Sequence, residues 1–149
     1  MRSIKYIAVH CTAGSQKQTV ASLLQEFKRK GWNNPGYHYV ISADGQIHQL
    51  LDEDKVSNGV KGYNSVSINV AYMGGVDLNN KLAPIDNRTE AQKKSLCAIL
   101  NKLHKKYPKA IIQGHRDFSP DKNGNGIVDP WERIKSCPCF DAKVEYKDI

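Results

Sequence analysis

Two histidines and one cysteine have the types and positions of ligands to a catalytic metal. His10 follows the apolar run at residues 6–9, and His115 follows the run at 111–114, so each would lie at the end of a strand, a stiff place for a ligand. Cys137 comes later, in a segment that proline restricts. Two imidazoles and one thiolate make a zinc site whose open fourth position can hold the water that hydrolysis requires. A histidine at a strand end is more often structural, so spacing alone leaves both interpretations open.

A second candidate metal motif, DKNGNGIVDPWE, lies between His115 and Cys137 at residues 121–132. It fits the calcium-loop pattern D-x-[DN]-x-[DN]-G-x5-E at every specified position. The oxygen ligands would be the side chains of Asp121, Asn123, Asn125 and Glu132, the backbone carbonyl of Ile127, and Asp129 through a water. An ordered cation would fix the distance between His115 and Cys137. The alternative is a surface turn rich in asparagine and glycine.

The elements that must position these residues can be predicted from apolar periodicity and from turn and capping residues. Strands are expected at residues 4–9, 37–42, 46–51, 67–73 and 110–113. Asp44-Gly45 predicts a hairpin between the second and third of these strands. Thr19 is expected to cap a helix that Gly31 ends, and Thr89 with Gln92 forms a capping box for a longer helix that stops before Pro108. A short closing helix is expected near residues 140–146.

This alternation predicts the fold class α/β, with a single mixed β-sheet flanked by helices. The chain has 149 residues, with 40% hydrophobic and 25% charged, which fits one globular domain over residues 1–149 that carries the calcium-loop-like insertion at 121–132. No apolar run approaches the ~20 residues that span a bilayer, so we expect no membrane insertion. The first residues show no secretion signal.

The net charge bears on which partners the protein can bind, and the number of cysteines bears on whether it contains disulfides. The net charge of +7 favours polyanions, but the basic residues are dispersed without interleaved aromatics, so we expect no nucleic acid. Four cysteines in a chain of this length without a signal peptide do not predict disulfides. Cys139 is too close to Cys137 to share an ion comfortably, and we expect Cys11, Cys97 and Cys139 to be small buried residues.

Five segments occur in an order that resembles one known family. They are VHCTA (9–13), GYHYVI (36–41), KGYN (61–64), GHRD (114–117) and KSCPCFD (135–141). Together they resemble the N-acetylmuramoyl-L-alanine amidases of the amidase-type phage lysozyme and peptidoglycan recognition protein family. The resemblance extends from Ile4 to about Val144.

The resemblance implies both a fold and a reaction. The fold would be a mixed sheet flanked by helices, with zinc at the floor of a groove held by His10, His115 and Cys137. The enzyme would be a zinc amidohydrolase that cuts the amide between N-acetylmuramic acid and L-alanine in peptidoglycan. Tyr37 matches a tyrosine that the phage enzymes need, and Lys135 matches their catalytic lysine. We expect Lys135 to stabilise the oxyanion and Tyr37 to position water or to move a proton.

The chain departs from the family pattern at two places. Some members carry a glutamate base on the strand at 67–72, where Ala71 is the corresponding residue here. A histidine that often precedes the KGYN segment is absent, because Gly59 and Val60 stand there. His38 has no assigned catalytic role, and we expect it to pack or to support a metal ligand.

Other functions remain open at this stage. A peptidoglycan-binding module without catalysis would keep the fold, but such members commonly lack the cysteine ligand, and Cys137 is present. Two further alternatives are a regulatory protein that binds another protein through its basic surface and a nucleic-acid-binding zinc protein. For the leading interpretation we expect a monomer that is made in the cytoplasm and acts on the cell wall, through phage-like release or a leader outside this sequence.

Overall fold

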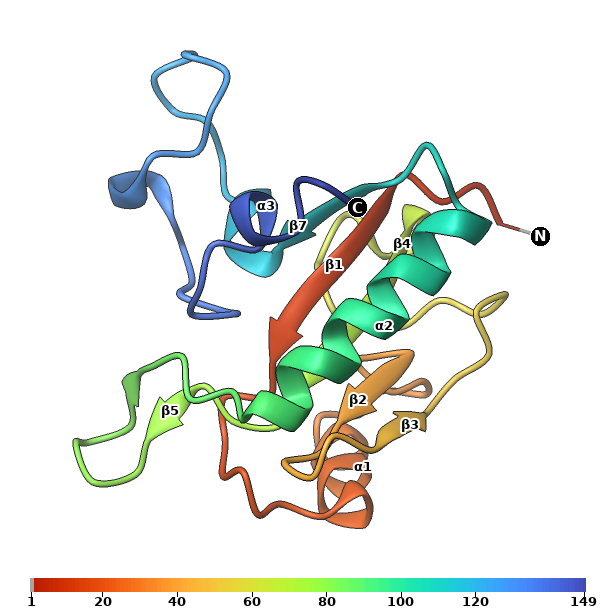
Figure 1. Ribbon diagram of the computed structural model, residues 1–149, viewed down its shortest axis with the longest axis vertical. Coiled ribbons are helices and arrows are strands. Elements are labelled where there is room, and N and C mark those ends of the chain that lie inside the picture. The colour runs from red at the N-terminus through yellow and green to blue at the C-terminus, as the bar shows by residue number, and fades with distance from the viewer. Residues whose placement is uncertain (1) are drawn as a thin grey trace.

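A five-stranded sheet in the order β3-β2-β4-β1-β7 forms the centre of the protein (Figure 1). The computed structural model describes residues 2–149. The strands are β1 (Tyr6–Cys11), β2 (Tyr39–Ile41), β3 (Ile47–Gln49), β4 (Ser67–Tyr72) and β7 (Ile111–Gly114). Four of them run parallel, and β3 pairs antiparallel to β2 at the edge. The predicted mixed sheet is confirmed, with strand ends that differ from the expected ones by at most two residues.

Helices cover both faces of this sheet. Val70 and Tyr72 of β4 pack in the larger core cluster with α2 (Glu90–Lys106), which crosses the sheet in Figure 1. The next residue along from each, Ala71 and Met73, packs instead with α1 (Val20–Arg29). Successive side chains of a strand point to opposite faces, so β4 is buried on both sides. This is why all six residues of β4 are buried, instead of buried and exposed residues alternating along the strand.

The predicted capping residues begin the helices. The Thr19 hydroxyl accepts a hydrogen bond from the Ser22 N–H, and Thr89 and Gln92 form the reciprocal capping box. Gly45 has φ of +87° in the β2–β3 hairpin, a conformation that glycine adopts without strain. These local signals therefore operate in the folded chain as the sequence predicts.

Several elements were not predicted from periodicity. A two-stranded ribbon, β5 (Val76–Asp77) with β6 (Ala83–Pro84), follows the sheet, and such two-residue strands are too short to show a pattern. Short 3₁₀ turns occur as η1 (Asn64–Val66), η2 (His115–Phe118) and η3 (Pro130–Glu132). The closing helix is found as α3 (Ala142–Glu145).

The expectation that all three non-ligand cysteines are buried is wrong for Cys97, which is exposed. The buried stripe of α2 consists of Leu96, Ile99, Leu100 and Leu103, and this spacing turns Cys97 toward solvent. Cys11 is buried and Cys139 is partly buried, with their Sγ atoms 4.0 Å apart. Among residues 2–149, no helix is both long and apolar enough to cross a membrane.

Arg88 joins the C-terminal helix to the start of α2. Its guanidinium binds both carboxylate oxygens of Asp86 at 2.9 Å and those of Glu145 at 2.6 and 2.8 Å. It also lies 3.4 Å from the ring centroid of Phe140. The Tyr72 hydroxyl donates to the Pro138 carbonyl at 2.7 Å. The segment that follows Cys137 is thus fixed to the core by buried polar contacts as well as by packing.

Candidate metal centre

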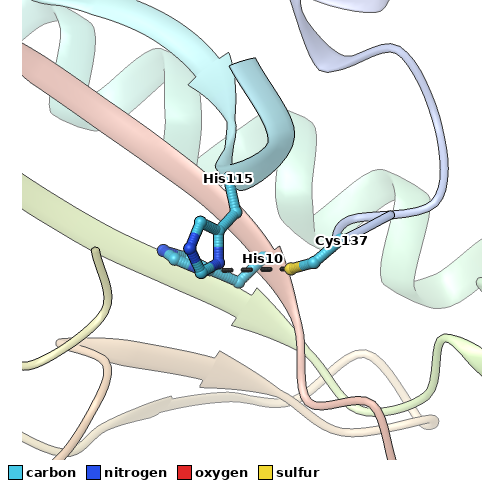
Figure 2. A group of neighbouring side chains, drawn as sticks. All are labelled: His10, His115 and Cys137. Carbon is cyan, nitrogen blue, oxygen red and sulfur yellow. Dashed lines mark hydrogen bonds between the residues drawn. The ribbon is translucent and has the colours of Figure 1, made fainter. Parts of the chain in front are cut away.

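The register of two parallel strands brings His10 and His115 together. Val9 of β1 pairs with Gly114 of β7, so the residues that follow them are neighbours at the carboxyl ends of the strands. The two imidazole ring centroids lie 4.8 Å apart. Figure 2 shows the His10, His115 and Cys137 side chains gathered in one place, with a dashed line between His10 and Cys137. The carboxyl end of a parallel sheet is a common place for functional sites in α/β proteins.

Cys137 reaches the same place from the far end of the insertion. The Arg116 N–H donates to the Cys137 carbonyl at 2.8 Å, which fixes the backbone beside His115. The Cys11 N–H points at the Cys137 Sγ atom at 3.1 Å, and Sγ lies 3.9 Å from His10 Nδ1. One potential ligand atom from each of the three residues lies within 4.8 Å of the others. The predicted trio is therefore assembled, although 126 residues or more separate the cysteine from His10 and Cys11.

The surroundings keep both imidazoles neutral. Burial lowers the pKa of His10 to about 4, against the opposing effect of the hydrogen bond that His10 donates to the Asn69 amide oxygen, and the charge of Lys135 lowers it further. Burial, followed by the proximity of His10 and Lys135, lowers the pKa of His115 to about 3. A neutral imidazole has the free lone pair that metal binding requires. At neutral pH the site is therefore in a state that can accept a metal.

The donor set fits zinc. Two imidazole nitrogens and one cysteine sulfur are the atoms that zinc prefers, and three protein ligands are typical of catalytic sites. At tetrahedral angles, zinc bonds of about 2.0 Å to nitrogen and 2.3 Å to sulfur place those two ligand atoms roughly 3.5 Å apart. The distance of 3.9 Å between His10 Nδ1 and Cys137 Sγ is close to this value. The Cys11 N–H also provides a hydrogen bond that stabilises a thiolate.

The two residues with expected catalytic roles line the same cleft. This cleft, of about 210 Å³, is lined by the trio together with Tyr37 and Lys135. The Tyr37 ring centroid is 5.1 Å from that of His10, and its hydroxyl donates to the Cys11 carbonyl at 3.3 Å. Burial, followed by the nearby Cys137 and Cys11, raises the pKa of Tyr37 well above its usual value, so its phenol stays protonated. Lys135 is exposed at the rim. Larger hollows, of about 350 and 380 Å³, lie elsewhere and have neither histidine nor cysteine in their walls.

Sequence reasoning missed the residues behind His10. His10 Nε2 lies 2.8 Å from the Asn69 Oδ1 atom, and Asn69 is fully buried on β4. A polar residue inside an otherwise apolar strand was the available signal, because burial of an amide is unfavourable unless it is hydrogen-bonded. Ala71 pairs with His10 across the strands and is buried, so the position of the alternative glutamate is apolar here.

The absence of a histidine at Gly59 also has a structural reason. A Cβ atom on Gly59 would lie 2.4 Å from Cγ and Oδ1 of Asn69, closer than side chains pack. Val60 is buried. The Asn69 amide thus fills the space next to Gly59, and a larger side chain at Gly59 would displace it.

In the insertion, four of the six residues of the calcium-loop motif are exposed, Asp129 is partly buried and Glu132 is buried. The Asp121 carboxylate accepts from the Gly124 and Gly126 N–H groups at 3.0 and 2.8 Å. Asp129 Oδ2 accepts from the side-chain amides of Asn123 and Asn125 at 3.0 and 2.9 Å. Glu132 is buried and accepts from the Asp129 N–H at 2.8 Å. Ile127 is exposed at the far side of the loop. Within residues 2–149, the cluster of three or more histidine, cysteine or acidic ligands is the His10, His115 and Cys137 trio.

Comparisons with known proteins agree with this geometry. A family model described as N-acetylmuramoyl-L-alanine amidase matches residues 1–138. The endolysin of Enterobacteria phage K11 is 36% identical over 137 residues, which cover 91% of this chain and 80% of that protein. The solved structure of the Ph2119 endolysin from the Thermus scotoductus MAT2119 bacteriophage Ph2119 has a TM-score of 0.69 at 27% identity, covering 93% of this chain and 79% of that one.

A structural neighbour of lower identity shows the same fold. It is the ectodomain complex of peptidoglycan recognition proteins LCa and LCx with tracheal cytotoxin bound, at a TM-score of 0.64 and 19% identity, covering 91% of this chain and 75% of that one. The match to the family model over most of the chain, together with the endolysin relatives, supports peptidoglycan amidase activity. This chain belongs to the N-acetylmuramoyl-L-alanine amidase family.

Proposed function

We propose that this protein is a zinc-dependent hydrolase that cleaves the amide between N-acetylmuramic acid and L-alanine in bacterial peptidoglycan. His10, His115 and Cys137 would hold the zinc. The observation that carries the proposal is the convergence of these three ligands, within 4.8 Å of one another, in the lining of a cleft that Tyr37 and Lys135 also line. We propose that residues 1–149 act as one monomeric amidase domain.

The residues of the cleft would have different roles in amide hydrolysis. Zinc, when bound, supplies a Lewis acid that polarises a carbonyl and lowers the pKa of a water to about 7. The Lys135 ammonium stabilises negative charge that develops on the carbonyl oxygen of the substrate. The protonated phenol of Tyr37 orients the attacking water or gives a proton to the departing amine. The cleft also contains Lys30, and the two lysines favour an anionic muramyl peptide.

The alternative is a peptidoglycan-binding module that does not cut. The neighbour with bound tracheal cytotoxin shows that this fold can hold a muramyl peptide in another protein. The complete ligand set in this chain favours the enzyme, because binding alone does not need a metal with an open position. Peptidoglycan as the substrate also places the site of action at the cell wall.

Digestion of purified peptidoglycan, combined with metal analysis, tests the proposal. We expect one zinc ion per chain and the release of free L-alanine amino termini without new reducing sugars. New reducing ends in place of amines would identify a glycosidase. Saturable binding of muramyl peptides without turnover by the zinc-loaded protein would identify the binding module.

Replacement of Lys135 with alanine should lower kcat about 100-fold or more, because removal of one oxyanion-stabilising group typically costs 10²–10³ in rate. Zinc content should change little, since Lys135 is exposed, whereas KM should rise modestly because one of the two lysines that attract the anionic peptide is lost. Lys135→Arg should recover part of the rate. Lys94→Ala removes the same charge from the exposed side of α2 and serves as the control. Full turnover by Lys135→Ala would remove this residue from the mechanism.

Replacement of Tyr37 with phenylalanine should lower kcat about 100-fold, within the range for loss of a general acid–base group. The one hydrogen bond that is lost, to the Cys11 carbonyl at 3.3 Å, should reduce stability by only about 1 kcal/mol. Tyr107→Phe loses a comparable bond, to Glu53 at 2.8 Å, far from the cleft, and should keep its activity. Equal rates for the two variants would contradict the role of Tyr37.

We further propose that the loop at 121–132 binds calcium through the six residues named above. Calcium added to the zinc-loaded protein should then raise the melting temperature, with a gain of about 2.7 kcal/mol when calcium is 100 times its Kd. Glu132→Gln should abolish this gain, whereas Asp148→Asn, at an exposed carboxylate near the C-terminus, should not. If calcium and its chelators leave both melting temperature and activity unchanged at fixed zinc, the loop is a surface turn.

A further inference from the structure

Behind His10, a line of buried polar side chains crosses the interior to the loop at residues 52–60. His10, Asn69, Ser57 and His38 are all at most 1% exposed. His10 Nε2 lies 2.8 Å from Asn69 Oδ1, and Asn69 Nδ2 lies 2.7 Å from Ser57 Oγ. Ser57 Oγ is in turn 3.0 Å from His38 Nδ1. Because these groups have no solvent to bond with, each must take a donor or acceptor role that suits its neighbours.

At the far end of the line, the donor and acceptor roles of the two His38 ring nitrogens are fixed by the backbone. The Asn69 backbone N–H, which can only donate, points at His38 Nδ1 at 3.1 Å. Nδ1 therefore carries the lone pair and Nε2 carries the proton, which is donated to the Lys55 carbonyl at 2.7 Å. Arg2 Nη2 lies 3.2 Å from the same Nε2 atom, but it donates to the Glu53 carbonyl at 2.8 Å. The tautomer of His38 follows from the backbone around it.

The acceptor role of His38 Nδ1 determines the donor and acceptor roles of the remaining groups as far as His10. Since His38 Nδ1 is an acceptor, the Ser57 hydroxyl donates to it, and the Ser57 oxygen accepts from the Asn69 amide nitrogen. The amide oxygen then faces His10, so Nε2 of His10 carries the proton. The opposite orientation of the amide would make Ser57 donate to Asn69 and would set two lone pairs against each other over the 3.0 Å between Ser57 and His38.

Gly59 holds the amide in place from the other side. A Cβ atom there would lie 2.4 Å from Cγ and Oδ1 of Asn69 and 2.8 Å from Nδ2. The amide is therefore enclosed by the strand, the serine and the glycine backbone. It has little room to turn.

We propose that Asn69, directed by Ser57 and His38, is a positioning residue that fixes the tautomer of His10 and leaves Nδ1 free as the metal ligand. Nδ1 is the nitrogen that lies 3.9 Å from Cys137 Sγ. A metal-ligating histidine usually donates its other N–H to an acceptor, which sets its orientation and its affinity for the ion. Here a neutral amide takes the place of the more common carboxylate or backbone carbonyl. The inference rests on the proposed zinc site.

The first test reads the tautomer directly in the metal-free protein. Long-range ¹H–¹⁵N correlation spectra should show His10 protonated on Nε2 in the wild type. In Asn69→Leu, which has the same side-chain branching and no hydrogen-bonding group, the signal should change to a mixture of tautomers or to the Nδ1–H form. A wild-type His10 protonated on Nδ1, or an unchanged Nε2–H form in Asn69→Leu, would overturn the proposal.

The second test separates metal affinity from stability. Asn69→Leu should weaken zinc binding about 10- to 100-fold in chelator competition, the usual effect of losing a partner of a metal ligand. Asn69→Asp keeps an oxygen toward His10 and should retain affinity within about a few-fold of the wild type, even though a buried carboxylate lowers the melting temperature of the apoprotein. A purely structural role would order the two variants by stability instead.

The serine provides a matched pair. Ser57→Ala removes the oxygen that accepts from the Asn69 amide nitrogen and so orients this amide. The substitution should weaken zinc binding several-fold. Ser67→Ala removes one buried hydroxyl on the same strand as Asn69, bonded to the Tyr63 carbonyl at 2.7 Å, and should leave zinc affinity unchanged. Equal zinc affinities for these two variants would contradict the role of Ser57.

The outcomes distinguish this inference from the proposed function. If the wild type binds no zinc while His10 shows the Asn69-dependent tautomer, the zinc site fails and the positioning of His10 stands. If the wild type binds zinc and cleaves peptidoglycan while Asn69→Leu has the same tautomer and affinity, the positioning role fails alone.

Discussion

Replacement of Cys137 with serine should abolish stoichiometric zinc binding and lower kcat/KM at least about 1000-fold, since each 1.36 kcal/mol of lost transition-state stabilisation is a factor of ten. The Cys137 sulfur is the one anionic donor of the trio, and it lies 3.9 Å from His10 Nδ1 and 3.1 Å from the Cys11 nitrogen. A serine hydroxyl is shorter and does not ionise near neutral pH, so it cannot replace the thiolate.

Two other cysteines provide the controls for this substitution. Cys139 lies two residues away, with its Sγ 3.3 Å from the Gly75 carbonyl, and Cys139→Ser should keep its zinc. Cys97→Ser changes an exposed thiol on α2 and should have no effect on either quantity. Zinc content by elemental analysis and the sulfur-to-cobalt charge-transfer band of the cobalt-substituted protein give the readout. A Cys137→Ser variant with one tightly bound zinc and full turnover would disprove the ligand assignment.

Replacement of Arg88 with alanine should lower the free energy of unfolding by about 3 kcal/mol, at the low end of the range for removing one partner of a buried ion pair. The Arg88 side chain is only 2% exposed, whereas Asp86 and Glu145 are 31% and 41% exposed and regain some solvation. For a chain of this size the melting temperature should fall by roughly 10 °C. Arg88→Lys keeps the charge but loses the planar bidentate contact, so its free energy of unfolding should lie between those of the wild type and Arg88→Ala.

The same cluster predicts how stability depends on pH. Hydrogen bonding to Arg88 lowers the pKa of Glu145 despite burial, and for Asp86 the contacts with Arg88 outweigh burial and also lower the pKa. Because both values are depressed in the folded state, this stabilisation is present above the unfolded pKa values of about 4 and is lost as the pH falls through the folded ones. Below about pH 4, stability should therefore fall more steeply in the wild type than in Arg88→Ala. Parallel curves would show that the ion pairs contribute nothing.

Arg88→Ala should also affect the metal centre. The guanidinium lies against Phe140, three residues beyond Cys137, and α3 follows directly. A looser C-terminal segment would leave the Cys137 sulfur less well positioned, so zinc affinity should fall together with stability. In contrast to Asn69→Leu, the tautomer of His10 should stay unchanged.

Local chemistry allowed much of the fold to be predicted from the sequence. The Thr89–Gln92 capping box and the Thr19 cap depend on contacts between residues three apart, and the β2–β3 hairpin depends on two residues at its turn. Cys97 was misjudged because it was assigned by residue type, whereas the spacing of the apolar residues in α2 places position 97 on the exposed face. The β5–β6 ribbon was missed because strands of two residues have no period.

The sequence by itself determined which residues could bind a metal, because imidazole and thiolate groups are rare and their chemistry is intrinsic to their type. The tertiary structure decided that they meet: pairing of Val9 with Gly114 places two histidines side by side, and the Arg116 contact returns Cys137 to them. The structure alone also decided which nitrogen of His10 is free. That choice depends on Asn69, Ser57 and His38, which come from three separate segments and reach hydrogen-bonding distance only in the folded chain.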